Sequence, residues 1–297
     1  RLPGLALGGT RRDTPNAPMD LQLSDDPTGA PTPRPTNDNN PLSGDVRFGD
    51  DLLMGIRFFS RLPTGRAPHR RPNLTRMALA LPFASLVIGV GPALVLLGLE
   101  WLSVPHYFAA ALAVTAMVAA TGGMAEDALA DSLDGLFGGH DVETRLAIMK
   151  DSRHGTYGVC AIVLLLALRI AAIGSIANPL AAAGVWLAAA VMARSGALWL
   201  PVALPAARTG GAAATAGQVS RQAFGIGAIF MVVLSFVLAA FAVSVVGLIV
   251  AYVLGALVVW GWVTLCRRLV GGQTGDLIGG LMALVEVAVL TGFMVFV

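Results

Sequence analysis

Apolar runs of about twenty residues recur along this chain from Met77 to the C-terminus. A helix of that length crosses the hydrocarbon core of a bilayer, which is about 30 Å thick. Most of the runs lack the polar positions at helical spacing that a helix in a water-soluble bundle needs. Only 13% of the residues are charged, against about a quarter in a soluble domain. The sequence therefore predicts an all-α integral membrane protein, built as a polytopic helical bundle.

The apolar runs predict about seven transmembrane helices, and the lysine and arginine residues between them indicate how the bundle is oriented. The predicted spans are residues 78–99, 106–125, 157–177, 180–200, 223–242, 244–265 and 277–297. Basic residues occur before the first span and in every second connection after it, whereas the connections near EWLSVPH, ANP and VSVVG have none. By the positive-inside rule, the N-terminus and the charged connections face the cytoplasm, so we expect an active site on that face.

The N-terminal part differs from the rest in composition. Residues 1–45 are rich in proline and have almost no apolar periodicity, which predicts a disordered tail in front of a catalytic membrane domain over residues 46–297. The stretch DLLMGIRFF, residues 51–59, can form a short amphipathic helix on the membrane surface or an ordinary flank of the first span. The sequence leaves both interpretations open.

Charged residues gather in the segment EDALADSLDGLFGGHDVETRLAIMKDSRHG, residues 126–155. Within it, Asp127, Asp131 and Asp134 have the spacing D-x-x-x-D-x-x-D, which places three carboxylates on one face of a helix. Like charges repel, so such a stripe needs a cation or bound protons. Mg²⁺ commonly takes one or two carboxylates together with substrate phosphates. The stripe predicts a Mg²⁺ site for a phosphorylated substrate; a solvated acidic helix end is the alternative. Glu126, one residue off the stripe, is expected to support the site from outside or to be solvated.

Basic residues follow the stripe directly. Lys150, the only lysine of the chain, comes shortly before Arg153 and His154, just ahead of the third span. Arginine binds phosphate as a planar fork and lysine as a point charge, so these residues are predicted phosphate contacts. An ordinary basic flank of the span is the alternative.

Two more acidic residues lie near the C-terminus. Asp276 stands among glycines in RRLVGGQTGDLIGG, and Glu286 lies inside the last predicted span. A carboxylate within a membrane is costly unless it is paired. We therefore expect Glu286 to pair with Arg169 or Arg194, which are the arginines inside other spans.

Four motifs, RFFSRLPTGR, EDALADSLDGLFGG, RLAIMKDSRHGTYGV and GGQTGDLIGG, resemble in order and spacing those of the adenosylcobinamide-GDP ribazoletransferase family, the membrane cobalamin synthases. The resemblance covers residues 50–297. It implies a Mg²⁺-dependent enzyme of the bacterial cytoplasmic membrane in the last steps of cobalamin biosynthesis. Adenosylcobinamide-GDP would react with α-ribazole, or its 5′-phosphate, to give adenosylcobalamin, or its phosphate, and GMP.

The resemblance also suggests roles for the residues that match. Asp127 and Asp131 are the expected metal ligands, and Asp134 is a third ligand or the base that takes the proton of the ribazole hydroxyl. Lys150 and Arg153 would hold the diphosphate or the charge that develops on it. The expected substrate-binding residues are Arg61, His154, Arg208 and Asp276.

Other classes of protein fit less well. A net charge of +2 without a basic stripe argues against a nucleic-acid partner, which leaves the substrates, the lipid bilayer and a possible homo-oligomer as partners. A membrane phosphotransferase of the CDP-alcohol type carries D-x-x-D-G-x-x-A-R, and here no Ala-Arg pair follows Gly135. A transporter would place its polar groups near the midplane, often in repeated halves, whereas these charges collect at one boundary.

Overall fold

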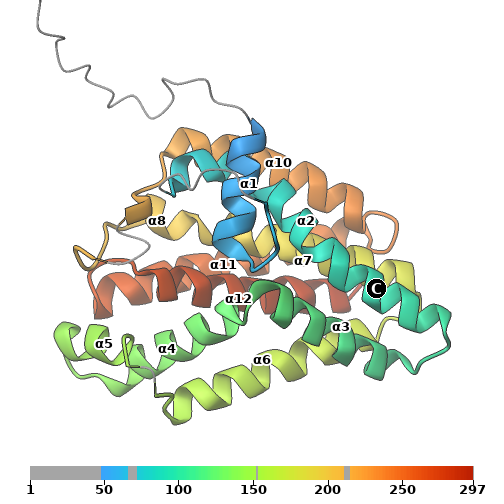
Figure 1. The fold of residues 1–297 in the computed structure, drawn as a ribbon, viewed down its shortest axis with the longest axis horizontal. Helices are drawn as coiled ribbons and strands as arrows, with labels where there is room; N and C mark the ends of the chain where they lie inside the picture. The colour runs from blue at the N-terminus through green and yellow to red at the C-terminus, as the bar shows by residue number, and fades with distance from the viewer. Residues whose placement is uncertain (1–47, 66–71, 152, 211–214, 297) are drawn as a thin grey trace, which may run out of the picture. The chain divides into compact units, whose positions relative to one another are not determined.

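The computed structural model describes residues 48–65, 72–151, 153–210 and 215–296. The predicted tail, residues 1–45, lies outside these residues. In the described part the regular elements are helices (Figure 1). One isolated parallel bridge pairs Ala206 with Gln273 outside these helices. The all-α prediction is confirmed. The helices are α1 (Phe48–Phe59), α2 (Leu74–Trp101), α3 (His106–Thr121), α4 (Met124–Gly138), α5 (Val142–Ile148), α6 (Thr156–Gly174), α7 (Pro179–Ala197), α8 (Trp199–Ala203), α10 (Arg221–Ala239), α11 (Val245–Leu269) and α12 (Gly275–Met294).

Six helical segments are each long and apolar enough to cross a membrane: α2, α6, α7 continued by α8, α10, α11 and α12. Helix α3 has 16 residues, which is about 24 Å of helix. It passes the same test only together with α4, across a bend of 82°. The described residues therefore contain six candidate spans, or seven if the bent pair counts as one. The helix in the predicted second span, residues 106–125, ends at Thr121, because the chain turns sharply after it.

The bend is made by two glycines. Gly122 and Gly123 have φ angles of 68° and 69°, in the left-handed region that glycine adopts at little cost. The side chain of Arg61 packs against the first of them, since a Cβ atom on Gly122 would lie 2.6 Å from Arg61 Cγ. The backbone N–H of Arg61 also donates to the carbonyl oxygen of Ala120 at 2.8 Å. These contacts set the direction in which α4 leaves α3.

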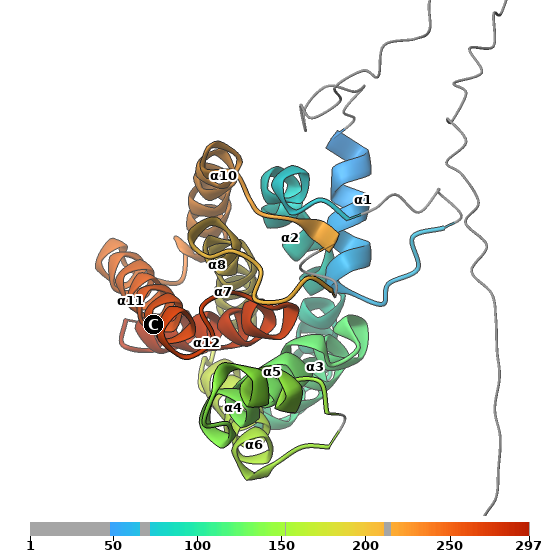
Figure 2. The ribbon, with the colours of Figure 1, turned by 90° about the vertical axis from the view of Figure 1, so that its left-hand side faces the viewer.

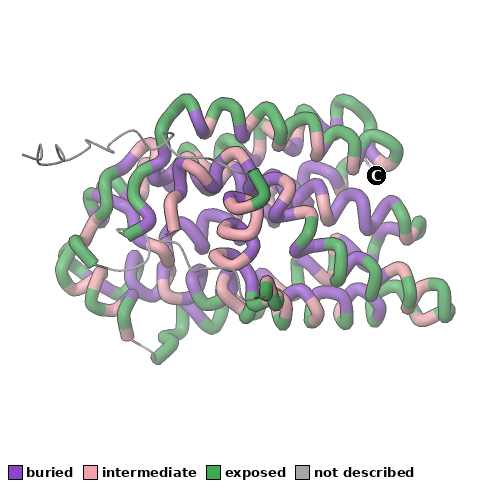
Figure 3. Tube along the Cα trace, turned by 45° about the horizontal axis from the view of Figure 1, so that its top comes forward, coloured by how far each residue is buried: buried purple, intermediate pink, exposed green. Residues whose placement is uncertain are grey.

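Helices α7 and α12 form the interior of the bundle. In their most apolar windows 78% and 72% of the residues are buried, against 22% for α10 and 28% for α11. Buried stretches lie mainly in the middle of the bundle, and exposed stretches mainly along its outside (Figure 3). Small residues let the backbones approach closely, as at Gly292 of α12, where a Cβ would lie 2.7 Å from Ala251 Cα of α11. The inner helices therefore hold the bundle together, while most residues of α10 and α11 are exposed or only partly buried.

The predicted helix at DLLMGIRFF is present as α1, which packs on α2. Ile56 and Phe59 of α1 are buried, and Asp51 accepts a hydrogen bond of 2.8 Å from Arg76 Nε of α2. Helix α1 is thus fixed to the bundle by apolar contact and by an ion pair.

Candidate active site

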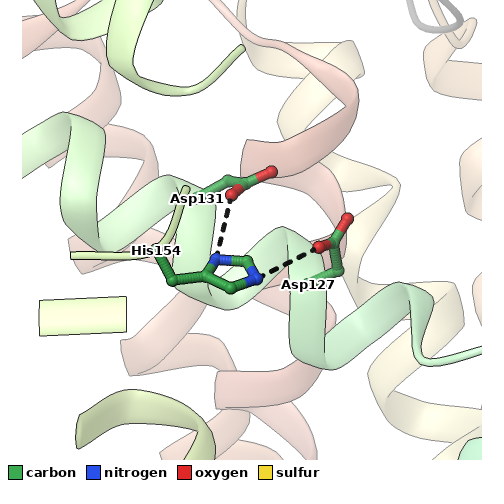
Figure 4. Close-up of side chains that lie close together, drawn as sticks. All are labelled: Asp127, Asp131 and His154. Carbon is green, nitrogen blue, oxygen red and sulfur yellow. Dashed lines mark ion pairs between the residues drawn. The ribbon is translucent and has the colours of Figure 1, made fainter. Parts of the chain in front are cut away.

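Asp127 and Asp131 lie one turn apart on α4, and both face the ring of His154 (Figure 4). His154 Nε2 is 3.9 Å from Asp127 Oδ1, and His154 Nδ1 is 3.7 Å from Asp131 Oδ1. One ligand atom from each of the three residues lies within 4.8 Å of the others. We call these three residues the acidic group. It joins α4 to the segment that precedes α6.

The donor atoms of the acidic group suit a divalent cation. Carboxylate oxygens are the ligands that Mg²⁺ prefers, and an imidazole nitrogen is more typical of zinc, copper or iron sites. Asp127 is exposed and Asp131 is half-buried, so substrate oxygens can reach an ion held between them. The two carboxylates fit Mg²⁺ with substrate phosphates as further ligands.

Asp134, the third aspartate of the stripe, is buried and turned towards α6. Its Oδ2 accepts the backbone N–H of Gly155 at 2.6 Å, and its Oδ1 accepts that of Gly158 at 2.9 Å. Gly155 is the N-cap of α6 and has no side chain with which to cap it, so Asp134 caps this helix from α4. A Cβ on Gly155 would lie 2.6 Å from Asp134 Oδ1, which explains the glycine. Because His154 immediately precedes Gly155, this contact holds His154 over the other two aspartates.

Asp276 and Arg208 form an ion pair beside the acidic group. Arg208 Nη2 donates to Asp276 Oδ2 at 3.2 Å, in the first turn of α12. Helix α12 meets α4 closely through its next turn, where a Cβ on Gly279 would lie 2.5 Å from Ala128 Cβ. The negative charge of Asp276 therefore lies close to those of Asp127 and Asp131. A third carboxylate, from the far end of the chain, thus adds to the negative potential at the site.

The other basic residues predicted for the site have no described bond to the carboxylates of the acidic group. Arg153 forms an exposed ion pair with Asp151, at 2.6 Å, and its hydrogen bonds lower the pKa of Asp151 to about 2. Lys150 is exposed, and Arg61 lies at the bend before α4. Among the described residues, no hydrogen bond or ion pair joins Lys150, Arg153 or Arg61 to Asp127 or Asp131.

A buried network of ion pairs involves another face of α4 than the acidic group. Arg169 of α6 binds Glu126 of α4 on one side and Glu286 of α12 on the other, the latter at 2.7 Å. Trp186 of α7 also donates to Glu286, at 3.2 Å. The predicted pairing of Glu286 with an intramembrane arginine is confirmed, and the partner is Arg169. Glu126 is not solvated, because its side chain is buried in the bundle and pairs with Arg169.

The sequence compares closely with one family. The model of the CobS family, cobalamin-5-phosphate synthase, matches residues 51–294. The chain belongs to this family. All residues of the acidic group and of the buried network fall within the matched range, and the resemblance drawn from the four motifs is confirmed.

Several members of the cobalamin-5-phosphate synthase family are similar over most of the chain. An adenosylcobinamide-GDP ribazoletransferase from Azorhizobium caulinodans is 38% identical over 252 residues, which is 83% of this chain and 96% of the relative. One from a Sinorhizobium species is 39% identical over 255 residues, covering 82% and 95%. One from Xanthobacter autotrophicus is 39% identical over 265 residues, covering 84% and 97%. No solved structure matches this chain.

Proposed function

We propose that this protein joins α-ribazole, or its 5′-phosphate, to adenosylcobinamide-GDP at the acidic group and releases GMP. Adenosylcobinamide-GDP ribazoletransferase activity, a step of cobalamin biosynthesis, follows from the family and from relatives that match nearly their whole length. One observation carries the location of the reaction: two carboxylates and an imidazole from separate segments converge within 4.8 Å.

In the proposed site, Asp127 and Asp131 hold a Mg²⁺ ion. The ion would neutralise the diphosphate of the substrate and the charge that builds up on the departing GMP. Two aspartates one turn apart suit this task, because they concentrate negative charge where a cation must bind. Asp276 adds to that charge and holds Arg208 at the edge of the site.

His154 is the proposed base. A histidine can take up a proton near neutral pH, and its ring lies beside the carboxylates that would bind the diphosphate. The ribazole hydroxyl oxygen forms a bond to the phosphorus that carries the cobinamide, and the bond from this phosphorus to GMP breaks. GMP leaves with the bonding electrons, and the hydroxyl proton passes to His154.

The other residues have supporting roles in the proposal. Asp134 positions His154 through its bonds to Gly155 and Gly158, and so acts through the loop rather than on the substrate. Arg208 keeps one buried guanidinium nitrogen, Nη1, without a hydrogen-bond partner among the described residues, and this N–H group can donate to a substrate phosphate. Lys150 and Arg153 are exposed cations on the approach to the site and would attract the diphosphate. Arg61, which packs on Gly122 at the bend before α4, is a further candidate for the same task.

Turnover by the purified full-length protein tests this proposal. GMP release from adenosylcobinamide-GDP with α-ribazole should require Mg²⁺, and Asp131→Asn should lower its rate by at least about 100-fold, because a lost charge ligand weakens stabilisation of the transition state. The unfolding temperature should change little. Glu143→Gln, an exposed carboxylate of α5, is the matched control and should keep full activity. Full turnover by the Asp131 variant would remove this residue from the site.

A further inference from the structure

A cavity lies on the other side of α12 from the acidic group. It is a groove of about 620 Å³ between α10 and α11, with residues of α7, α8 and α12 at its base. Helix α12 separates it from α4, since α12 packs on α11 and on α4 (Figure 2). The lining is mainly apolar and includes Trp199, Phe224, Val259 and Val285. Neither Asp127, Asp131 nor His154 contributes to it, so the groove is separate from the proposed reaction site.

The groove opens sideways, towards the surface that faces lipid. Ala256 and Trp260 of α11 line it and are exposed, Trp260 by 70%. Helices α10 and α11 are candidate spans with the smallest buried fractions, 22% and 28%. Their exposed sides therefore face hydrocarbon rather than water. An occupant of the groove must have an apolar body that can enter from the bilayer.

One end of the groove is cationic. Arg221 is the first residue of α10 and Arg267 lies in the last turn of α11, and both line the groove. The two helices follow one another across a short turn, so these two ends lie at the same end of the bundle. Neither arginine has an ion pair or a side-chain hydrogen bond among the described residues, and no described residue of the lining is acidic. The charge at this end is therefore available to an anion.

We propose that this groove binds an anionic phospholipid, with its phosphate between Arg221 and Arg267 and an acyl chain between α10 and α11. A basic pocket at the end of an apolar groove between membrane helices is the arrangement that selects anionic head groups. The bidentate geometry of arginine suits phosphate oxygens. A free nucleotide or ribazole phosphate would satisfy the arginines but would leave the apolar, membrane-open part of the groove unfilled.

Native mass spectrometry of the full-length protein, released from detergent, tests the proposal. Phosphatidylglycerol and phosphatidylcholine with the same acyl chains are added in parallel. The protein should carry one phosphatidylglycerol with about tenfold higher affinity than phosphatidylcholine, because only the anionic head group pairs with both arginines. Arg221→Gln combined with Arg267→Gln should remove this preference. Arg268→Gln, an exposed neighbour outside the groove, should keep it.

A second variant tests the apolar part of the groove independently of its two arginines. Ala256→Phe adds volume at the exposed mouth, where folding should tolerate it, and should weaken binding of both lipids while Arg221 and Arg267 remain. Equal binding of the two lipids by the unaltered protein would overturn the proposal. A lipid-free dimer would also overturn it by assigning the groove to a second copy, and so would displacement of the lipid by inorganic phosphate.

Discussion

At the scale of single residues, the three aspartates of the stripe do different work. Asp127 and Asp131 face His154, whereas both oxygens of Asp134 are bound by backbone N–H groups of α6. His154 lies 3.7 and 3.9 Å from the carboxylates, which is beyond hydrogen-bond range, so these contacts do not fix its position. The hydrogen bonds that Asp134 accepts from Gly155 and Gly158 fix the segment that carries His154.

Asp134→Asn distinguishes this positioning role from direct chemistry. The amide can replace one of the two charge-assisted hydrogen bonds, so we expect a loss of about 2 kcal/mol in the free energy of unfolding. The unfolding temperature and the rate of GMP release should fall together, as measured by scanning fluorimetry and by turnover. Loss of turnover at an unchanged unfolding temperature would instead assign Asp134 to the substrate or the metal.

His154→Ala tests whether the histidine is a base or a metal ligand. As a base, it should contribute about 100-fold or more to kcat, while the Mg²⁺ concentration for half-maximal activity stays the same. His140→Ala removes an exposed histidine outside the acidic group and is the control. A marked rise in the Mg²⁺ requirement of the His154 variant would identify the histidine as a ligand.

At the scale of helices, α4 packs against α3, α5, α6 and α12. Gly122 and Gly123 turn it away from α3, Gly279 lets α12 approach it, and Arg145 of α5 donates from Nε to the carbonyl oxygen of Leu136 at 3.3 Å. The buried network then joins α4 to α6 and α12 through Arg169. The acidic group therefore rests on a helix whose position is determined by contacts with distant parts of the chain.

Arg169→Met should test the strength of this junction. It leaves Glu126 and Glu286 buried without their shared cation, and breaking a buried pair in this way typically costs about 3–5 kcal/mol of stability. We expect a large fall in the unfolding temperature in detergent. Adding Glu126→Gln and Glu286→Gln should restore part of it, because these two side chains then carry no charge that Arg169 would have to neutralise. An unchanged unfolding temperature for Arg169→Met would show that the network is not stabilising.

At the scale of the whole molecule, polar chemistry and basic residues share one end of the bundle. The acidic group adjoins the start of α12 and the α5–α6 connection, and the α2–α3 connection at the other end has no lysine or arginine. From the positive-inside rule we propose that the acidic group faces the cytoplasm. Substrates made in the cytoplasm would reach it without crossing the membrane.

Cysteine labelling of intact cells checks this orientation. The background is Cys160→Ser with Cys266→Ser, which removes both native thiols. Ser103→Cys, in the connection between α2 and α3, should react with a membrane-impermeant maleimide from outside. Lys150→Cys should react only after the cells are made permeable. The reverse pattern would invert the proposed topology.

The sequence by itself determined the class of protein and located the acidic residues of the candidate site. The length and polarity of the apolar runs predicted the spans, because these depend only on local composition and on the thickness of a bilayer. The acidic spacing predicted carboxylates on one helix face, and the intramembrane Glu286 predicted a cationic partner. Each of these depends on helix geometry or on the cost of burying charge, which act within one segment.

Only the tertiary structure decided how distant segments meet. Helical periodicity gives the direction of a side chain around its own axis, but not the group that a neighbouring helix presents to it. The sequence therefore could not predict that Asp134 caps α6 although it shares the stripe with Asp131. For the same reason it could not decide that Glu286 pairs with Arg169 rather than with Arg194. The sharp bend at Gly122 and the approach of His154 have the same origin, since both depend on packing between residues far apart along the chain.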